Sequence, residues 1–397
     1  MRNPFSRIFQ MLLLLIALLP STLAAQNSPT DLLAYTTTVD GNTQLMLYDT
    51  ATEQTRIVVE NISGFEFHSS GKVAYTVTTQ NPSALYVLDA LAPNATPISI
   101  SQSTTGQYMV WNWSRDGKYL AYEVRTDQDY SIFIWDGESS VEISQEPVSR
   151  FGSTYWYETS WSQDNKLAFT VADSTSGNTE IFVWDGTKIF NVSQNQLRRN
   201  SSPHWSADGR LAFLSGENVS YGKYDILVWD GKSFKNGLPD RDTFIHLSSE
   251  LINYLSRPHW NDDGDLEFFG WGENDKQGRI YVWDGEDIVG STYRMTADDK
   301  FIYWSPNGQW ANVVTTALYR TTSFLTLVDK NNEVVLEVEA EYMIWSANSL
   351  LAFCSWEPQL GWVLSIWDGK TITKIAEQRR DFVVQWLGGS SIACSNG

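Results

Sequence analysis

The stretch "WSADGRLAF" (205–213) has the form of a tight β-hairpin, with a tryptophan, a polar turn and a short apolar strand. Asp-Gly suits such a turn because glycine accepts a positive φ and aspartate can bond to nearby main-chain N–H groups. Closely related phrases occur along the chain: "WSRDGKYLAY" from Trp113, "WSQDNKLAF" from Trp161, "WNDDGDLEF" from Trp260, "WSPNGQWAN" from Trp304 and "WSANSLLAF" from Trp345. The hairpin is therefore one copy of a repeat.

A second phrase alternates with the hairpin, as in "IFVWDG" and "ILVWDG". This phrase and its degenerate relatives end at Asp49, Asp89, Asp136, Asp185, Asp230, Asp284, Asp329 and Asp368, spaced 39 to 54 residues apart. The hairpin phrase is anchored at Phe67, Trp113, Trp161, Trp205, Trp260, Trp304, Trp345 and Trp386, spaced 41 to 55 residues apart. Short strands with a period of about 40–50 residues are typical of β-propeller blades.

Each repeat divides into four strands. Strand a ends at the anchor, strand b follows the hairpin turn, strand c precedes "WDG", and strand d follows it. We therefore predict an all-β protein, a single propeller over 26–397 with eight four-stranded blades, or seven as the alternative count. The predicted mature chain opens with "DLLAYTTT" and "LMLYD", which match strands b and c, and closes with "DFVVQW" and "SSIACS", which match strands a and b. Pairing of these terminal strands would close the propeller.

The phrases "PHWSADGRLAF" and "WSRDGKYLAY" resemble the WD-like propeller repeat of TolB and its exported relatives. The resemblance covers 26–397. It implies a propeller, but the sequence departs from TolB in the absence of an N-terminal α/β domain before the propeller and in a larger predicted number of blades, so we do not expect the role of TolB itself to transfer. The repeat also accounts for twelve of the 18 tryptophans, which we expect to pack between blades.

Residues 1–25 have the pattern of a secretory signal peptide. Arg2 and Arg7 precede the apolar run "MLLLLIALLP", and "STLAAQ" offers small residues for cleavage before Gln26. The apolar run is shorter than the roughly 20 residues of a transmembrane helix, so we expect no membrane span. We predict export to the periplasm or the extracellular space.

The chain is strongly acidic, with a formal net charge of −19 over 397 residues. Removing Arg2 and Arg7 with the signal peptide leaves −21. Such a surface repels phosphate backbones and anionic lipids, so we expect no nucleic-acid partner. We expect a monomer whose ligand is a protein or a carbohydrate.

The loops that join strands b and c, and those that join strand d to the next strand a, vary in sequence and emerge at one end of the blades. Variable loops on a rigid scaffold commonly carry binding residues. Aromatic side chains with a few arginines suit sugars or peptides. The predicted binding residues of this loop face are Trp156, Tyr157, Arg257, Trp271, Tyr319, Arg320, Trp356 and Trp362. The alternative is that these aromatic residues only cover the ends of the blades.

His204 and His259 occupy equivalent places in consecutive repeats, each in "PHW". Two histidines that converge on the propeller channel can hold a metal ion, as in a polysaccharide lyase or hydrolase. The alternative is that both are framework residues. We find no complete catalytic constellation, no G-x-S-x-G elbow and no phosphate loop, so we predict no catalytic residues and no cofactor.

Cys354 and Cys394 are the only two cysteines. Aligned on the repeat, they have opposite strand parity in consecutive blades. This parity is compatible with a disulfide across the closure and equally with two sulfurs that point apart.

Overall fold

The structure is a computed structural model of the 397-residue chain. It describes residues 31–77, 84–92, 94–101, 107–125, 130–144, 153–172, 176–217, 224–247, 252–255, 258–261, 263–272, 279–290, 299–304, 310–315, 323–328, 334–387, 389 and 391–395. All of them belong to one unit, Asp31–Gly397. The predicted signal peptide lies outside the described residues.

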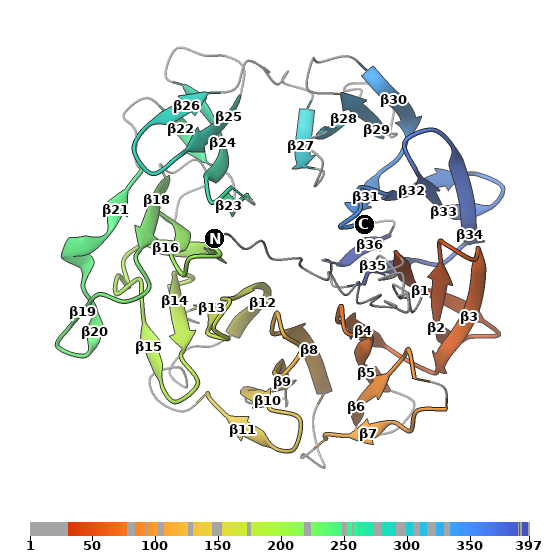
Figure 1. Cartoon of the computed structure of the whole chain (residues 1–397), viewed down its shortest axis with the longest axis horizontal. Helices are drawn as coiled ribbons and strands as arrows, with labels where there is room; N and C mark the ends of the chain where they lie inside the picture. Colours follow the sequence, from red (N-terminus) through yellow and green to blue (C-terminus); the bar gives the residue numbers. More distant parts are fainter. Residues whose placement is uncertain are drawn as a thin grey trace, which may run out of the picture. The chain divides into compact units, whose positions relative to one another are not determined.

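One sheet joins the two ends of the chain (Figure 1). In spatial order it contains β3 (Gln54–Glu60), β2 (Asn42–Asp49), β1 (Leu32–Val39), β35 (Phe382–Trp386) and β36 (Ser391–Cys394). Strands β1 and β35 are antiparallel, with Leu33 opposite Trp386. The predicted pairing of the terminal strands is confirmed. Strand β36 adds a fifth strand beyond β35.

The next sheets each follow one repeat. The first of them is formed by β4 (Gly64–Phe67), β5 (Lys72–Val77), β6 (Ala84–Asp89) and β7 (Ile98–Ser99). The second is formed by β8 (Gln107–Trp113), β9 (Leu120–Arg125), β10 (Tyr130–Trp135) and β11 (Ser140–Glu142). In both, chain order equals spatial order, and each strand is antiparallel to its predecessor.

Two repeats share one eight-stranded sheet. The first contributes β12 (Ser153–Trp161), β13 (Leu167–Ala172), β14 (Thr179–Trp184) and β15 (Ile189–Asn191). The second contributes β16 (Arg199–Trp205), β17 (Leu211–Gly216), β18 (Tyr224–Trp229) and β21 (Ile245–His246). A single parallel contact, Thr179 with Arg199, joins the two halves.

The second of these repeats carries an insertion between β18 and β21. It forms the small hairpin β19 (Phe234–Lys235) and β20 (Leu238–Pro239), followed by a 3-10 turn at Arg241–Thr243. We call residues 234–243 the strap. Its hairpin is a separate two-stranded sheet.

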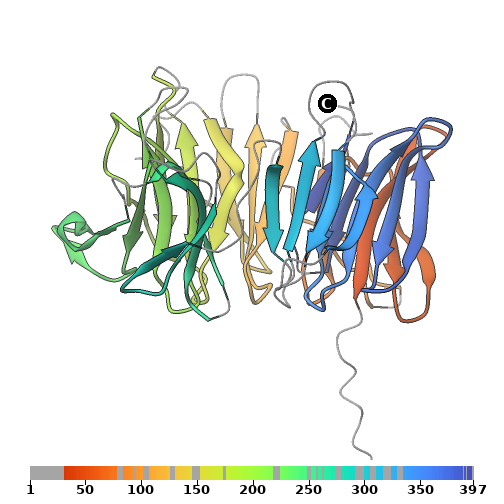
Figure 2. The ribbon, with the colours of Figure 1, turned by 90° about the horizontal axis from the view of Figure 1, so that it is seen from above.

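Three further sheets complete the described strands. They are β22 (Ile252–Leu255), β23 (His259–Trp260), β24 (Leu266–Gly272), β25 (Arg279–Trp283) and β26 (Ile288–Gly290); β27 (Asp299–Trp304), β28 (Trp310–Thr315), β29 (Ser323–Val328) and β30 (Val334–Glu339); and β31 (Tyr342–Trp345), β32 (Leu351–Glu357), β33 (Gly361–Trp367) and β34 (Ile372–Gln378). Figure 2 shows the strands side-on, with their turns at the two ends.

The core lies between consecutive sheets. Strands β13 and β14 are buried along their whole length, whereas the outermost strand β34 is largely exposed. One apolar cluster joins Ala121 and Ile132 of one sheet to Trp161 and Phe169 of the next. Because both faces of β13 and β14 are covered, these middle strands are largely apolar. The protein is a β-propeller, and its blade number stays a prediction.

The "WDG" phrase builds the turn between strands c and d. At Asp368 the carboxylate accepts the main-chain N–H groups of Thr371 at 2.7 Å and Lys370 at 2.8 Å. These hydrogen bonds hold the pKa of Asp368 below its usual value. Gly369 supplies a φ of +97°. The repeated aspartates are therefore turn residues.

Cys354 and Cys394 form a disulfide with their Cα atoms 6.1 Å apart. Cys354 lies in β32 and Cys394 in β36, and both are fully buried. The sequence left two orientations open, and the structure selects the one in which the sulfurs meet. The bond ties the last strand to the preceding sheet.

Candidate functional site

At three of the anchors, the side chain of the preceding residue links neighbouring repeats. Gln385 Oε1 accepts the main-chain N–H of Phe67 at 2.9 Å, and Ser160 Oγ accepts that of Trp205 at 3.1 Å. His204 Nδ1 accepts the N–H of Trp260 at 3.3 Å. At these three positions, a polar side chain just before one anchor thus satisfies a buried main-chain donor of the next repeat.

Three anchor tryptophans also bind the preceding sheet through their indole N–H groups. The indole Nε1 of Trp113 donates to Glu66 O at 3.1 Å, that of Trp260 to His204 O at 3.0 Å and that of Trp386 to Ile344 O at 3.0 Å. Each of these three indoles fills apolar space and uses its single donor on the preceding sheet. The anchors are therefore packing residues, as the sequence predicts.

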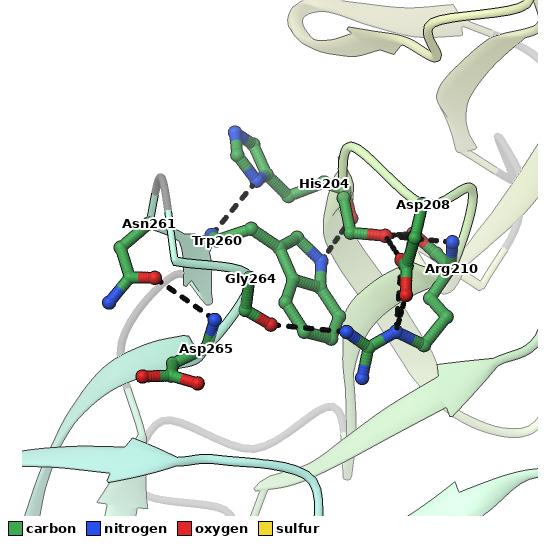
Figure 3. Close-up of polar contacts among 8 residues, drawn as sticks. His204, Asp208, Arg210, Trp260, Asn261, Gly264 and Asp265 are labelled. Carbon is green, nitrogen blue, oxygen red and sulfur yellow. Dashed lines mark hydrogen bonds and ion pairs between the residues drawn. The ribbon is translucent and has the colours of Figure 1, made fainter.

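The structure brings His204 and His259 together, with ring centroids 4.9 Å apart. Figure 3 shows His204 beside Trp260. The Nδ1 atom of His204 accepts the main-chain N–H of Trp260, so only Nε2 remains for another ligand. Desolvation, followed by the charges of His259 and Arg115, lowers the pKa of His204 to about 3. Within the described ranges, no group of three or more His, Cys, Asp or Glu side chains has the geometry of a metal site.

The junction in Figure 3 is further held by Arg210. Its guanidinium lies 4.3 Å from the centroid of the Trp260 ring and donates to Gly264 O at 3.1 Å. Asp208 pairs with the same guanidinium through its Oδ2 atom at 2.9 Å. These contacts bridge the turns of two neighbouring repeats, so the surroundings of His204 are those of a structural joint.

Glu66 occupies the pre-anchor position of its repeat and is only partly exposed. Desolvation raises the pKa of its carboxyl to about 8, although the hydrogen bond from Gln385 Nε2, 3.0 Å from Glu66 Oε1, acts in the opposite direction. Gln385 also bonds to Phe67 and Gly389, so the pair fastens the closing sheet to the next. Glu66 is therefore a framework residue whose carboxyl has a pKa near neutral pH.

For most of the predicted loop-face residues, the structure describes no side chain. Arg257, Tyr319 and Arg320 fall outside the described residues. The backbone places Trp156 and Tyr157 in β12, next to a register shift between Tyr155 and Thr159, and Trp271 near the end of β24. Their participation in binding stays a prediction.

Trp356 and Trp362 face each other across the β32–β33 hairpin. Their ring centroids are 5.3 Å apart in an edge-to-face arrangement. Trp362 is 0% exposed within the cluster that joins the last two sheets, so this residue offers no surface to a ligand. The strands continue to Glu357 and Gly361, so both tryptophans lie in the sheet instead of a loop. Trp356 is partly exposed and stays in the proposed binding set.

A groove of 610 Å³ runs along the outer edge of the β12–β15 repeat, beneath the strap. Its volume falls within the range of about 300–1,000 Å³ typical of small-molecule sites. We call it the strap groove. It is lined by Glu180, Lys188, Ile189, Phe190, Asn191, Gln194, Asn195, Gln196, Gly237 and Leu238.

The strap forms one wall of this groove because it packs on the preceding repeat. Phe234 contacts Phe190 with ring centroids 5.2 Å apart, and Gln194 Nε2 donates to Pro239 O at 2.8 Å. Phe190 is 4% exposed, whereas Val141 and Val289, at the same register in other repeats, are 56% and 61% exposed. The insertion thus covers an outer-strand position that elsewhere faces solvent.

Glu180 lies at the buried side of the strap groove and is 1% exposed. Its Oε2 accepts hydrogen bonds from Ser193 Oγ and from the main-chain N–H of Asn195, the latter at 3.2 Å. Its Oε1 is buried and has no partner among the described residues. A buried acceptor without a donor is costly, so Oε1 is an unsatisfied acceptor in the wall of the strap groove.

The strap groove was not predicted as a site. Two signals point to it in retrospect: the amide-rich run "NVSQNQ" (191–196) after strand d, and the long insertion after Asp230. Neither signal indicates that the insertion folds back on the preceding repeat.

Comparison with known proteins supports the fold alone. No protein-family model and no curated protein matches the chain. Dipeptidyl peptidase 4 from Porphyromonas gingivalis is 14% identical with a TM-score of 0.59, and the match covers 87% of this chain and 57% of that one. Prolyl oligopeptidase B from Galerina marginata is 12% identical with a TM-score of 0.55, covering 84% and 54%. This chain spans little more than half the length of these two enzymes.

TolB from Acinetobacter baumannii is 17% identical with a TM-score of 0.38, and the match covers 77% of this chain and 80% of that one. Among the described residues, no helix has the length and apolar character needed to cross a membrane. By its fold this chain is a β-propeller, as the TolB-like repeats of its sequence predict.

Proposed function

We propose that this protein is a non-catalytic, exported β-propeller that recognises a protein or a glycan, and that its binding surface comprises the strap groove at the outer edge of the β12–β15 repeat as well as the loop end of the blades. The observation that carries the proposal is the strap groove, a hollow of 610 Å³ bordered by polar side chains. The repeated polar positions before the anchors hold neighbouring sheets together. The groove is a departure from the repeat, and departures from a scaffold are where binding residues commonly lie.

Export is supported by two independent features. Residues 1–25 have the order of basic, apolar and small residues found in signal peptides. Cys354 and Cys394 form a disulfide, a bond that persists mainly in oxidising compartments. We therefore propose export to the periplasm or the extracellular space.

The test is binding of the mature protein, residues 26–397, to a mixed array of peptides and glycans. Gln196 is exposed at the groove, so Gln196→Trp should obstruct it without disturbing the core. Gln163, exposed in a tight turn, provides the control Gln163→Trp. We expect array signals that Gln196→Trp abolishes and Gln163→Trp preserves. Signals unaffected by Gln196→Trp would contradict the groove as the binding site.

The second candidate is a channel-centred lyase or hydrolase acting on polysaccharide, with a metal ion near His204 and His259. The observation that favours it is the 4.9 Å separation of the two rings. The use of His204 Nδ1 by Trp260 and the positive charge of Arg115 nearby oppose cation binding. Elemental analysis after dialysis against Zn²⁺ or Mn²⁺ tests this candidate. One equivalent of metal per chain, lost in His259→Ala, would favour it.

A further inference from the structure

We propose that the strap groove binds a neutral oligosaccharide through a row of carboxamide side chains and the carboxylate of Glu180. This inference rests on the proposed function and names the ligand class of that same groove. It is carried by three observations: which groove atoms lack a protein partner, how charge is distributed along the groove, and what covers the edge of β15.

The carboxamides keep part of their hydrogen-bonding capacity. Asn191 Oδ1 accepts the N–H of Gln194 at 2.8 Å, and Asn195 Oδ1 accepts the N–H of Leu197 at 3.2 Å. Within the described part of the chain, neither side-chain NH2 group has a partner, and Gln196 is engaged only through its main-chain O, which accepts from Asn178 Nδ2 at 2.9 Å. A carboxamide offers both donors and an acceptor in one plane. Sugar hydroxyls also donate and accept, so adjacent hydroxyls of a pyranose match this row.

Glu180 adds an acceptor at the buried side. Its Oε2 is held by Ser193 and Asn195, and its Oε1 has no donor in the described structure. An unfilled carboxylate acceptor pairs strongly with a hydroxyl donor, because hydrogen bonds to charged oxygens are among the stronger ones. A ligand hydroxyl directed at Oε1 would supply the missing partner.

Charge in the groove favours a neutral ligand. Its lining contains one carboxylate, that of Glu180, and one ammonium group, that of Lys188. Lys188 Nζ lies 5.9 Å from the Phe190 ring and 5.8 Å from the Phe234 ring, so it is drawn toward the aromatic wall. The two charges offset each other within a chain of net charge −19, and that overall charge disfavours an anionic glycan.

The strap disfavours a peptide ligand. A peptide that extends the sheet would pair with the open edge of β15, since edge strands recognise peptides through main-chain hydrogen bonds. Here the strap lies against β15, with Phe234 on Phe190 and Pro239 bonded to Gln194. The remaining lining combines side-chain amides with apolar atoms of Ile189 and Leu238, which suits the hydroxyls and the C–H face of a sugar.

The experiment is calorimetric titration of the mature protein with maltotetraose, cellotetraose and N-acetylchitotetraose. We expect at least one to bind, and we expect Gln196→Ala and Glu180→Gln each to weaken that binding by about tenfold, equivalent to about 1.4 kcal/mol. In Glu180→Gln the amide NH2 turns away from the Asn195 N–H and replaces the free acceptor with a donor. Gln163→Ala is the matched control and should bind as the wild type.

Two results would overturn the inference: none of the three oligosaccharides binds, or one binds equally well to wild type and Gln196→Ala. Near-UV circular dichroism shows whether the Glu180→Gln variant folds. If it does not fold, the Gln196→Ala variant decides the test, because the side chain of Gln196 is exposed. A groove-dependent peptide signal on the mixed array without oligosaccharide binding would leave the proposed function standing and overturn the carbohydrate assignment.

Discussion

Trp260 and His204 join two neighbouring sheets through two hydrogen bonds, both donated by Trp260. The indole N–H of Trp260 donates to His204 O at 3.0 Å, and its main-chain N–H donates to His204 Nδ1 at 3.3 Å. Trp205, the equivalent anchor one repeat earlier, is also buried, but its indole Nε1 has no partner among the described residues. The two anchors therefore form a matched pair that differs in one hydrogen bond.

Trp260→Phe should destabilise the protein more than Trp205→Phe does. Both changes remove part of a buried ring, and only the first leaves a buried carbonyl without its donor. We expect the two free energies of unfolding to differ by about 1 kcal/mol, the net worth of one hydrogen bond. Urea denaturation of both variants measures this difference. Equal losses would mean that the indole donor of Trp260 contributes nothing.

Glu66→Gln should stabilise the protein in a pH-dependent way. The folded pKa of about 8 lies above the ordinary value of 4.5. Between these values the unfolded state has released the proton while the folded state retains it, so wild-type stability falls as pH rises from about 4.5 to 8. Glutamine keeps the acceptor for Gln385 and does not titrate. Thermal unfolding should give similar Tm values at pH 4 and a higher Tm for the variant at pH 8. A constant Tm difference across this range would refute the assignment.

Removal of the disulfide should lower stability substantially. The Cys354–Cys394 bond closes a loop of sequence separation 40, and the loss of such a constraint costs about 3–4 kcal/mol. We expect the double variant Cys354→Ala/Cys394→Ala to unfold at lower urea concentration than the wild type. Dithiothreitol should shift the wild type in the same direction and leave the double variant unchanged. Titration of two free thiols in unfolded, unreduced wild type would contradict the bond.

Gly231 and Gly186 occupy the same position of the "WDG" phrase and should respond differently to alanine. A Cβ at Gly231 would lie 1.9 Å from Gly209 O, whereas one at Gly186 meets nothing within 4 Å. Both have positive φ, so both substitutions carry backbone strain of about 1–3 kcal/mol. Gly231→Ala adds a clash with a main-chain atom and should lower Tm further than Gly186→Ala. Equal Tm values would show that the two turns relax alike.

The repeat and its turns could be predicted from the sequence because they depend on local chemistry. Asp-Gly dipeptides determine where hairpins form, and apolar runs of strand length indicate sheets covered on both faces. The missing strand a at the start and the extra strand a at the end predicted that β1 pairs with β35, and Leu33 lies opposite Trp386 as a result. Edge strands need partners, so this inference needed no tertiary information.

Only the tertiary structure decided which side chains meet. Strand parity left Cys354 and Cys394 free to point together or apart, and the packing of the last two sheets brings them together. Trp362 is buried because the β32–β33 hairpin extends its sheet and packs against the neighbouring sheet. The sequence of this segment is typical of a loop and does not indicate the burial. The strap groove exists because Phe234 packs on Phe190, 44 positions earlier in the chain. The positions of strands and turns depend on the residues of each short stretch, so the sequence predicts them. Contacts between repeats depend on three-dimensional packing, which no single stretch of sequence encodes.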